Sequence, residues 1–357
     1  ATRDPRAVTR QLRTVLDANP HLEPAYRRAK QVVRIFRKAS FYEITQRCNL
    51  RCEGCYYFEG SQELGVTEED DLNVWEDFFA KEGERGVSMA YFFGAEPALE
   101  QGRLRAAAEH LDYGYFGTNG TMRVAEDLPF KLSVSLWAGD DETDKTLRGA
   151  TVYKKALKNF SGDPRANVVF TLTPWNLDTV PTVVQMCEDY GIGITFNMYS
   201  PTETFLDKLK RNLPNDDQFF RVSSQENSPC FTPDQLLQTR DTVEAVMTDF
   251  PDTVIYSRAF NRWVTQPQSL HEIDPETGIA PHCGSRIQGN MRYFTTDLAE
   301  KTPKCCTPDT NCGDCRMYSG AWSTKLMPTT DDFSSPQKLE EWIEMMDALS
   351  RIFLYPA

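Results

Sequence analysis

The chain has 357 residues, of which 40% are hydrophobic and 25% are charged, and this composition is typical of globular proteins rather than disordered or fibrous ones. No apolar run reaches the 18 residues expected of a membrane-spanning helix, and the first residues do not form a signal peptide. The net charge of −13 argues against a general nucleic-acid-binding protein, which would carry a basic surface.

The N-terminal segment differs in charge from the rest of the chain. Residues 1–38 contain ten Lys or Arg and three acidic residues, a net charge of +7, so residues 39–357 carry −20. From Leu22 to Lys38, apolar and basic residues alternate in a pattern that predicts a basic amphipathic helix. We expect this helix to pack on the acidic body with its basic face in solvent, and contact with a membrane surface is the alternative.

A repeating order of strand and helix begins near Ala39. The predicted strands are Phe41–Thr45, Val87–Phe93, Tyr113–Phe116, Lys131–Leu136, Val168–Leu172 and Gly193–Met198. Predicted helices between them cover residues 68–81, 104–111 and 180–190. Six such units predict an α/β fold of the partial (β/α)6 TIM-type barrel kind, in which functional residues lie at the carboxyl ends of the strands.

The pattern divides the chain into five parts. Residues 1–38 form the helical segment, residues 39–202 the barrel, and residues 203–280 a connecting region that begins with loops at 203–229. That region has a predicted helix at 236–250 and a strand at 253–257. Residues 281–328 form a small auxiliary domain and residues 329–357 a core-packing helix. Candidate substrate contacts are Tyr199, Glu203, Arg258, Asn261 and Arg262.

The most informative stretch is the cysteine-rich loop after the first strand. Cys48, Cys52 and Cys55 can supply three thiolates to one face of a cubane iron–sulfur cluster, which leaves one iron open to a ligand. A zinc knuckle is an alternative, but it needs a fourth ligand, and no His or Cys lies between residues 56 and 108. Chance clustering of buried cysteines is the other alternative.

This spacing, with Tyr56 beside the third cysteine, resembles the CxxxCxxC signature of the radical S-adenosylmethionine (SAM) superfamily. Three further strand-end segments resemble that superfamily in the same order: Gly94-Ala-Glu-Pro97 its GGEP segment, Thr118-Asn-Gly120 its TNG turn, and Ser133-Val-Ser135 with Asp144 and Arg148 its fourth-strand segment. The chain departs from the pattern at Ala95, where the second glycine is expected. It also has Trp137-Ala-Gly139 where Asp-Gly is usual.

The resemblance implies that the open iron binds SAM and that the reduced cluster cleaves it to a 5′-deoxyadenosyl radical. Glu96, Gly94, Thr118 and Asn119 would then surround the SAM ammonium group, for which a carboxylate is a suitable partner. Further expected contacts are Ser135 with the ribose, Arg148 with the SAM carboxylate or the substrate, and Asn176 near the cofactor.

A second group of cysteines follows the barrel. Four of the five residues Cys283, Cys305, Cys306, Cys312 and Cys315 could ligate one cluster or one zinc ion, with Cys305 and Cys306 as alternatives for one place. Residues 289–297 between them are predicted to form a hairpin. The arrangement resembles the SPASM/twitch extensions, and a single auxiliary 4Fe–4S cluster fits it best. We expect Cys187 and Cys230 to be isolated buried thiols.

An auxiliary cluster beside the substrate implies an oxidative reaction at an unactivated C–H position, either dehydrogenation or C–C, C–S or C–O bond formation. The short N-terminal segment favours a small-molecule substrate. A maturase of ribosomal peptides is the alternative, and a non-catalytic iron–sulfur electron carrier is a third hypothesis. The resemblance also implies a flavodoxin- or ferredoxin-type reductant. Ten cysteines without a disulfide pattern predict a reducing compartment, the cytoplasm.

Overall fold

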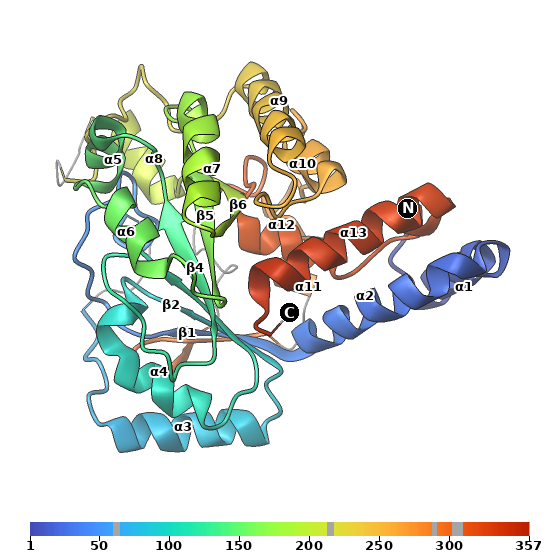
Figure 1. Cartoon of the computed structure of the whole chain (residues 1–357), viewed down its shortest axis with the longest axis horizontal. Helices are drawn as coiled ribbons and strands as arrows, with labels where there is room; N and C mark the ends of the chain where they lie inside the picture. The colour runs from blue at the N-terminus through green and yellow to red at the C-terminus, as the bar shows by residue number, and fades with distance from the viewer. Residues whose placement is uncertain (60–64, 213–217, 288–290, 302–309, 357) are drawn as a thin grey trace.

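The computed structural model describes residues 1–59, 65–212, 218–287, 291–301 and 310–356, and it is organised around one eight-stranded sheet (Figure 1). The sheet has the order β6-β5-β4-β3-β2-β1-β7-β8, and neighbouring strands from β6 to β7 run parallel. Its first six strands are β1 (Ala39–Glu43), β2 (Met89–Phe93), β3 (Gly114–Thr118), β4 (Lys131–Leu136), β5 (Ala166–Leu172) and β6 (Gly193–Met198). The predicted partial barrel is therefore confirmed.

Successive side chains of a strand point to opposite faces of the sheet, so alternate residues pack in two different layers. Phe41 stacks on Tyr91 of the neighbouring strand at 4.7 Å between ring centroids, on the inner face of the barrel. The next residue, Tyr42, faces the other way and meets Phe79 of α3 at 5.1 Å. Both faces of the sheet are thus covered, which explains why the strands read as near-continuous apolar runs.

The outer layer consists of helices that connect successive strands. They are α3 (Leu72–Glu84), α4 (Gln101–Ala108), α5 (Asp141–Arg148), α6 (Tyr153–Phe160) and α7 (Val180–Asp189). Helices α5 and α6 fill a stretch for which the sequence had suggested no element. The side chain of Asp140 caps the start of α5 by accepting from Thr143 N at 2.8 Å, and Gly149 ends it in a left-handed conformation.

A hairpin forms in this region, but its second strand lies beyond the predicted residues 289–297, and the hairpin belongs to the barrel sheet. Its strands are β7 (Arg292–Phe294), which pairs with β1, and β8 (Glu300–Lys301), which is antiparallel to β7. Tyr293 is only 2% exposed and stacks on Phe41 at 5.8 Å. This apolar contact explains why a segment that we had assigned to the auxiliary domain extends the sheet.

The connecting region is more helical than predicted. It contains α8 (Glu203–Lys210), α9 (Pro233–Asp249) and α10 (Arg258–Val264). The prediction of loops from residue 203 is wrong for α8, which begins where the hydroxyl of Thr202 caps Phe205 N at 3.1 Å. The predicted strand at 253–257 is reduced to one bridge between Val254 and Ile194, whereas the predicted helix at 236–250 is confirmed as α9.

The ends of the chain pack on each other and on the barrel. Helices α1 (Pro5–Ala18) and α2 (Glu23–Ile35) lie beside α13 (Pro336–Phe353), which confirms the predicted terminal helix (Figure 1). Phe353 reaches into the barrel, where its ring lies 4.9 Å from that of Tyr115. Residues of all three helices and of the sheet belong to one hydrophobic core. The N-terminal basic segment therefore packs on the body, while Arg27, Arg34 and Arg37 remain exposed.

The remaining elements are short. They are α11 (Gly284–Ile287), α12 (Tyr318–Lys325) and the 3₁₀ turns η1 (Pro20–Leu22), η2 (Phe36–Lys38), η3 (Pro97–Glu100), η4 (Leu177–Thr179) and η5 (Asp331–Phe333). Within the described ranges, we find no helix with the length and hydropathy needed to cross a bilayer.

Candidate active site

A cavity of about 280 Å³ opens at the carboxyl ends of the barrel strands. Its wall brings together almost every residue that the sequence had suggested for SAM and its cluster. Those residues are Cys48, Cys52, Cys55, Tyr56, Gly94, Glu96, Thr118, Asn119, Ser135 and Arg148. The position agrees with the rule that parallel α/β sheets bind ligands at the carboxyl edge.

The start of the cysteine loop is fixed by the end of the neighbouring strand. After β1 and β2, the pairing continues because Ala95 N donates to Thr45 O at 2.8 Å and Glu96 N donates to Arg47 O at 2.9 Å. Gly94 has φ of +127°, and a Cβ placed on it would lie 2.7 Å from Thr45 O. Only glycine fits this close backbone approach. At Ala95, by contrast, the departure from the family pattern leaves the backbone contact intact.

Glu96 follows β2, and its side chain is hydrogen-bonded to residues at the end of β3. Its carboxylate is 2% exposed and accepts hydrogen bonds from Thr118 Oγ1 at 2.7 Å, Asn119 N at 2.7 Å and Ala98 N at 3.1 Å. Burial raises the pKa of Glu96, and these donors oppose that effect. The carboxylate therefore holds the Thr118–Gly120 turn in place as well as facing the cavity.

Arg148 links helix α5 to the cysteine loop. Its Nε donates to Cys52 Sγ at 3.2 Å, its Nη1 donates to Ser135 O at 2.7 Å, and the side chain is 1% exposed. Burial would lower the pKa of Arg148, but the nearby Cys52 and Asp144 outweigh that effect and raise it. Asp144 is fully buried, and its Oδ1 has no hydrogen-bond partner among the described residues. A fixed cation thus stands beside the thiols.

The three thiols match the number and type of ligand that a cubane iron–sulfur cluster with one open iron requires. Cys48, Cys52 and Cys55 line one wall and interact electrostatically, and burial raises the pKa of Cys55 to about 12 and that of Cys48 above its usual value. Within the described ranges, no three Cys, His, Asp or Glu side chains converge on one metal ion. A cubane needs no such convergence, because each thiolate binds a different iron.

Several residues that the sequence analysis missed form the rest of the wall. Tyr115 of β3 and Tyr318 of α12 lie with their hydroxyl oxygens 2.7 Å apart, and burial raises the pKa of Tyr115 to about 12. Trp137 packs against Tyr199 at 5.6 Å. The inward positions of β4, β5 and β6 add Ser133, Thr171 and Asn197. Strict two-residue alternation along the predicted strands could have identified those three.

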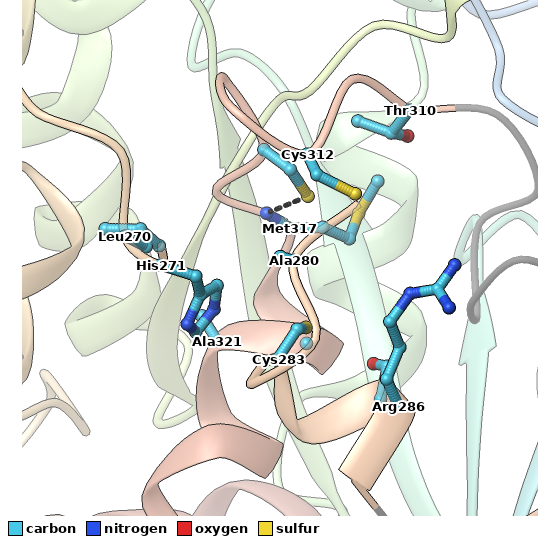
Figure 2. Close-up of a pocket in the computed structure, with 12 residues that line it drawn as sticks. Leu270, His271, Ala280, Cys283, Arg286, Thr310, Cys312, Met317 and Ala321 are labelled. Atoms are coloured by element: carbon cyan, nitrogen blue, oxygen red, sulfur yellow. Dashed lines mark hydrogen bonds between the residues drawn. The ribbon is translucent and has the colours of Figure 1, made fainter. Parts of the chain in front are cut away.

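A second cavity contains the cysteines that follow the barrel. Cys283, Cys312 and Cys315 line it together with His271, and Figure 2 shows the Cys283 and Cys312 side chains on opposite sides of the same space. Met317 N donates to Cys315 Sγ at 3.5 Å. Met317 also lines the first cavity, so the two cavities share this lining residue. Cys305 and Cys306 lie outside the described residues.

Some expected contacts are not brought to the cavity. Asn176 is fully buried. Its amide nitrogen donates to Trp137 O and Thr171 O, and its amide oxygen accepts from Thr173 N, all at 2.7–2.8 Å, so this side chain fixes strand ends instead. Four of the five candidate substrate contacts also lie elsewhere: Glu203, Arg258, Asn261 and Arg262 do not line it, whereas Tyr199 does. Arg258 and Arg262 pair with Glu244 on the outside.

The two isolated cysteines differ. Cys187 is fully buried in α7, as expected, and burial raises its pKa. The prediction of a buried thiol is wrong for Cys230, which lies in a loop and is partly exposed.

Comparison with known proteins places this geometry in a known fold. No protein-family model and no curated protein matches the chain. Among solved structures, Streptococcus suis SuiB matches with a TM-score of 0.51 at 13% identity, over 80% of this chain and 64% of SuiB. SuiB bound to S-adenosylmethionine matches with 0.50 at 13% identity, over 75% of this chain and 60% of that chain. A histidine-tagged form of anSMEcpe with bound AdoMet matches with 0.51 at 13% identity, over 86% of this chain and 96% of that chain.

The chain has the fold of SuiB and anSMEcpe. In this barrel, the cysteine loop follows β1, and the residues that resemble the family segments lie at the ends of β2, β3 and β4. The chain spans less than two thirds of the length of SuiB.

Proposed function

We propose that the chain is a radical SAM enzyme that oxidises an unactivated C–H position of a small-molecule substrate. One observation carries the proposal: three cysteine thiols, a buried carboxylate and a buried guanidinium face a single cavity at the carboxyl edge of the barrel. When bound, the cluster would supply the electron that cleaves SAM, and the 5′-deoxyadenosyl radical would take a hydrogen atom from the substrate.

The chain's own residues would bind and orient SAM. Glu96 supplies an anion for the ammonium group, and Arg148 supplies a cation for the carboxylate. The two side chains are close enough for Arg148 to affect the pKa of Glu96. Tyr56, Gly94, Thr118, Asn119 and Ser135 complete the proposed SAM site. This arrangement suits the zwitterionic amino-acid part of SAM.

The oxidative outcome is supported by the contact between the two cavities. The cysteine cavity that contains Cys283, Cys312 and Cys315 shares the lining residue Met317 with the first cavity. We propose that these three cysteines, with Cys305 or Cys306, hold an auxiliary 4Fe–4S cluster. The substrate radical would lose one electron to that cluster and one proton to solvent or a base, which gives net removal of two hydrogen atoms from the substrate.

The described wall also bears on the substrate. Apart from Glu96, Arg148 and the three cysteines, its described polar side chains are neutral: hydroxyls of tyrosine, serine and threonine, and the amides of Asn119 and Asn197. These neutral groups suit a small uncharged molecule with hydrogen-bonding groups. One side chain of a peptide would meet the same groups, so a peptide substrate is the second candidate.

The proposal is tested by anaerobic reconstitution of the chain, followed by addition of SAM and a low-potential reductant. We expect 5′-deoxyadenosine to form with the wild-type chain and to be absent from a Cys52→Ala variant. Wild-type protein that contains its full iron but forms no 5′-deoxyadenosine would contradict the proposal. An electron carrier would neither bind nor cleave SAM, so the same assay separates that hypothesis.

A further inference from the structure

The cysteine loop is held from outside by a segment far away in the sequence. Glu53 lies between Cys52 and Cys55 and is 1% exposed. Its carboxylate accepts hydrogen bonds from Arg221 N at 2.7 Å, Ser223 N at 2.9 Å and Val222 N at 3.3 Å. The hydroxyl of Ser223 donates to the same carboxylate. Three successive backbone amides thus converge on one buried anion, which is the geometry of an anion-binding nest.

Gly54, the residue after Glu53, is hydrogen-bonded to the same region. Gly54 N donates to Phe219 O at 3.0 Å, and Tyr199 Oη donates to Gly54 O at 2.7 Å. Gly54 has φ of +53°, and a Cβ there would lie 2.2 Å from Tyr199 Oη. On the other side, Glu53 N donates to Leu147 O at 2.7 Å. The loop between the second and third cysteines is therefore fixed on several sides by residues outside the barrel strands.

Among the described residues, the Glu53 carboxylate accepts hydrogen bonds from three backbone amides and one hydroxyl, which are suitable donors for a carboxylate. A negative charge held beside an iron–sulfur cluster stabilises the oxidised cluster and lowers its reduction potential. Groups behind the ligands also set how firmly a metal site is held, typically by 10- to 100-fold in affinity.

We propose that Glu53 is a positioning residue for the cluster at Cys48, Cys52 and Cys55: by binding the amides of residues 221–223 it fixes the Cys52–Cys55 turn, and its charge lowers the reduction potential. The inference rests on the proposed function only in assuming a cluster at this loop. It assigns a role to a residue that lies between the cysteines and does not itself line the cavity.

The test compares three variants of the reconstituted full chain. Glu53→Gln removes the charge, and Ser223→Ala removes one donor while Glu53 remains. Glu59→Gln is the matched control, because Glu59 lies on the same loop, is 4% exposed and pairs with Lys208 instead. The measurements are the rate of iron loss to a chelator and the midpoint potential of the electron paramagnetic resonance signal that changes when SAM is added.

We expect Glu53→Gln to lose iron from this cluster about 10- to 100-fold faster than wild type and to show a more positive potential. Ser223→Ala should change both quantities in the same direction by less, and Glu59→Gln should resemble wild type. If Glu53→Gln kept the wild-type potential and the wild-type rate of iron loss, the inference would be wrong. Wild-type protein without a SAM-sensitive signal would instead refute the proposed function.

Should Glu53→Gln fail to fold, its circular dichroism spectrum would show this, and Ser223→Ala would then decide the question. In that folded variant, a wild-type potential together with a wild-type rate of iron loss would also overturn the inference. Neither readout depends on turnover or on knowing the substrate.

Discussion

The guanidinium of Arg148 donates a hydrogen bond to the sulfur of Cys52 at 3.2 Å, so the last turn of α5 is tied to the second cysteine of the loop. The same side chain reaches Ser135 O and is almost fully buried. One cation therefore connects the cysteine loop, the end of β4 and the proposed site of the SAM carboxylate.

Replacing Arg148 with Lys keeps the charge but removes the planar fork that reaches two acceptors. We expect Arg148→Lys to weaken SAM binding by roughly 10- to 100-fold, because a hydrogen bond to a charged group contributes about 1.5–3 kcal/mol. Equilibrium dialysis with the reconstituted protein measures this affinity. Lys145→Arg, at an exposed position of the same helix, is the control and should bind SAM as wild type does.

Glu96 is proposed to bind the SAM ammonium group, and it also accepts hydrogen bonds from the Thr118–Gly120 turn. Different substitutions therefore test different roles. Glu96→Ala would leave the buried donors Thr118 Oγ1 and Asn119 N without an acceptor and lower the free energy of unfolding by about 1–3 kcal/mol. Glu96→Gln keeps an acceptor and removes the charge. We expect it to weaken SAM binding about tenfold or more while the iron content remains unchanged. Unchanged SAM affinity in Glu96→Gln would remove Glu96 from the SAM site.

Lys131 makes the stability of the fold depend on pH. It is 6% exposed at the start of β4, and burial together with Arg351 lowers its pKa to about 8. Between pH 8 and the ordinary value of 10.5, the unfolded chain holds a proton that the folded chain lacks, so this group makes stability rise with pH across that window.

We therefore expect Lys131→Met to remove this rise and to increase the free energy of unfolding at pH 7 by up to about 3 kcal/mol. Urea unfolding at several pH values measures both effects. Lys145→Met makes the same change of charge at an exposed position and should show neither effect. A Lys131→Met chain that is less stable than wild type at pH 7 would contradict the argument.

Phe353 provides a direct test of how α13 supports the barrel. Its ring lies 4.9 Å from Tyr115 and 4.9 Å from Tyr318, and only 2% of the residue is exposed. We expect Phe353→Ala to lower the free energy of unfolding by about 3–5 kcal/mol, as truncations of buried aromatic residues do. Leu237→Ala, at a residue that is 40% exposed, should change it by less than about 0.5 kcal/mol. Equal effects of the two substitutions would contradict this view of the core.

The sequence alone predicted those parts of the site that depend on local patterns. The cysteine spacing, Glu96 and Thr118–Gly120 all follow predicted strands, and the parallel sheet brings strand ends to one edge. The remaining parts depend on contacts between distant segments. Glu53 meets Ser223 across 170 positions, and Tyr115 meets Tyr318 across 203, and no local signal indicates such pairs.

Asn176 and Arg262 show the opposite error. Asn176 is a polar residue near the end of a predicted strand, and Arg262 is a polar residue of the connecting region, so both resembled binding residues. In the folded chain, the Asn176 side chain donates a hydrogen bond to the backbone oxygen of Trp137, and Arg262 forms an ion pair with Glu244. Similarly, β7 has no long apolar run, and it joins the barrel sheet through contacts with β1, where Tyr293 stacks on Phe41 and Phe294 stacks on Tyr42.

The most direct test of the central claim is the iron and sulfide content per chain after anaerobic reconstitution, in wild type and in a Cys48→Ala/Cys52→Ala/Cys55→Ala variant. With one 4Fe–4S cluster at the barrel loop and one auxiliary cluster, wild type should bind about eight irons and the variant about four. If the variant bound as much iron as wild type, Cys48, Cys52 and Cys55 would not hold a cluster, and the proposed radical SAM activity would be contradicted.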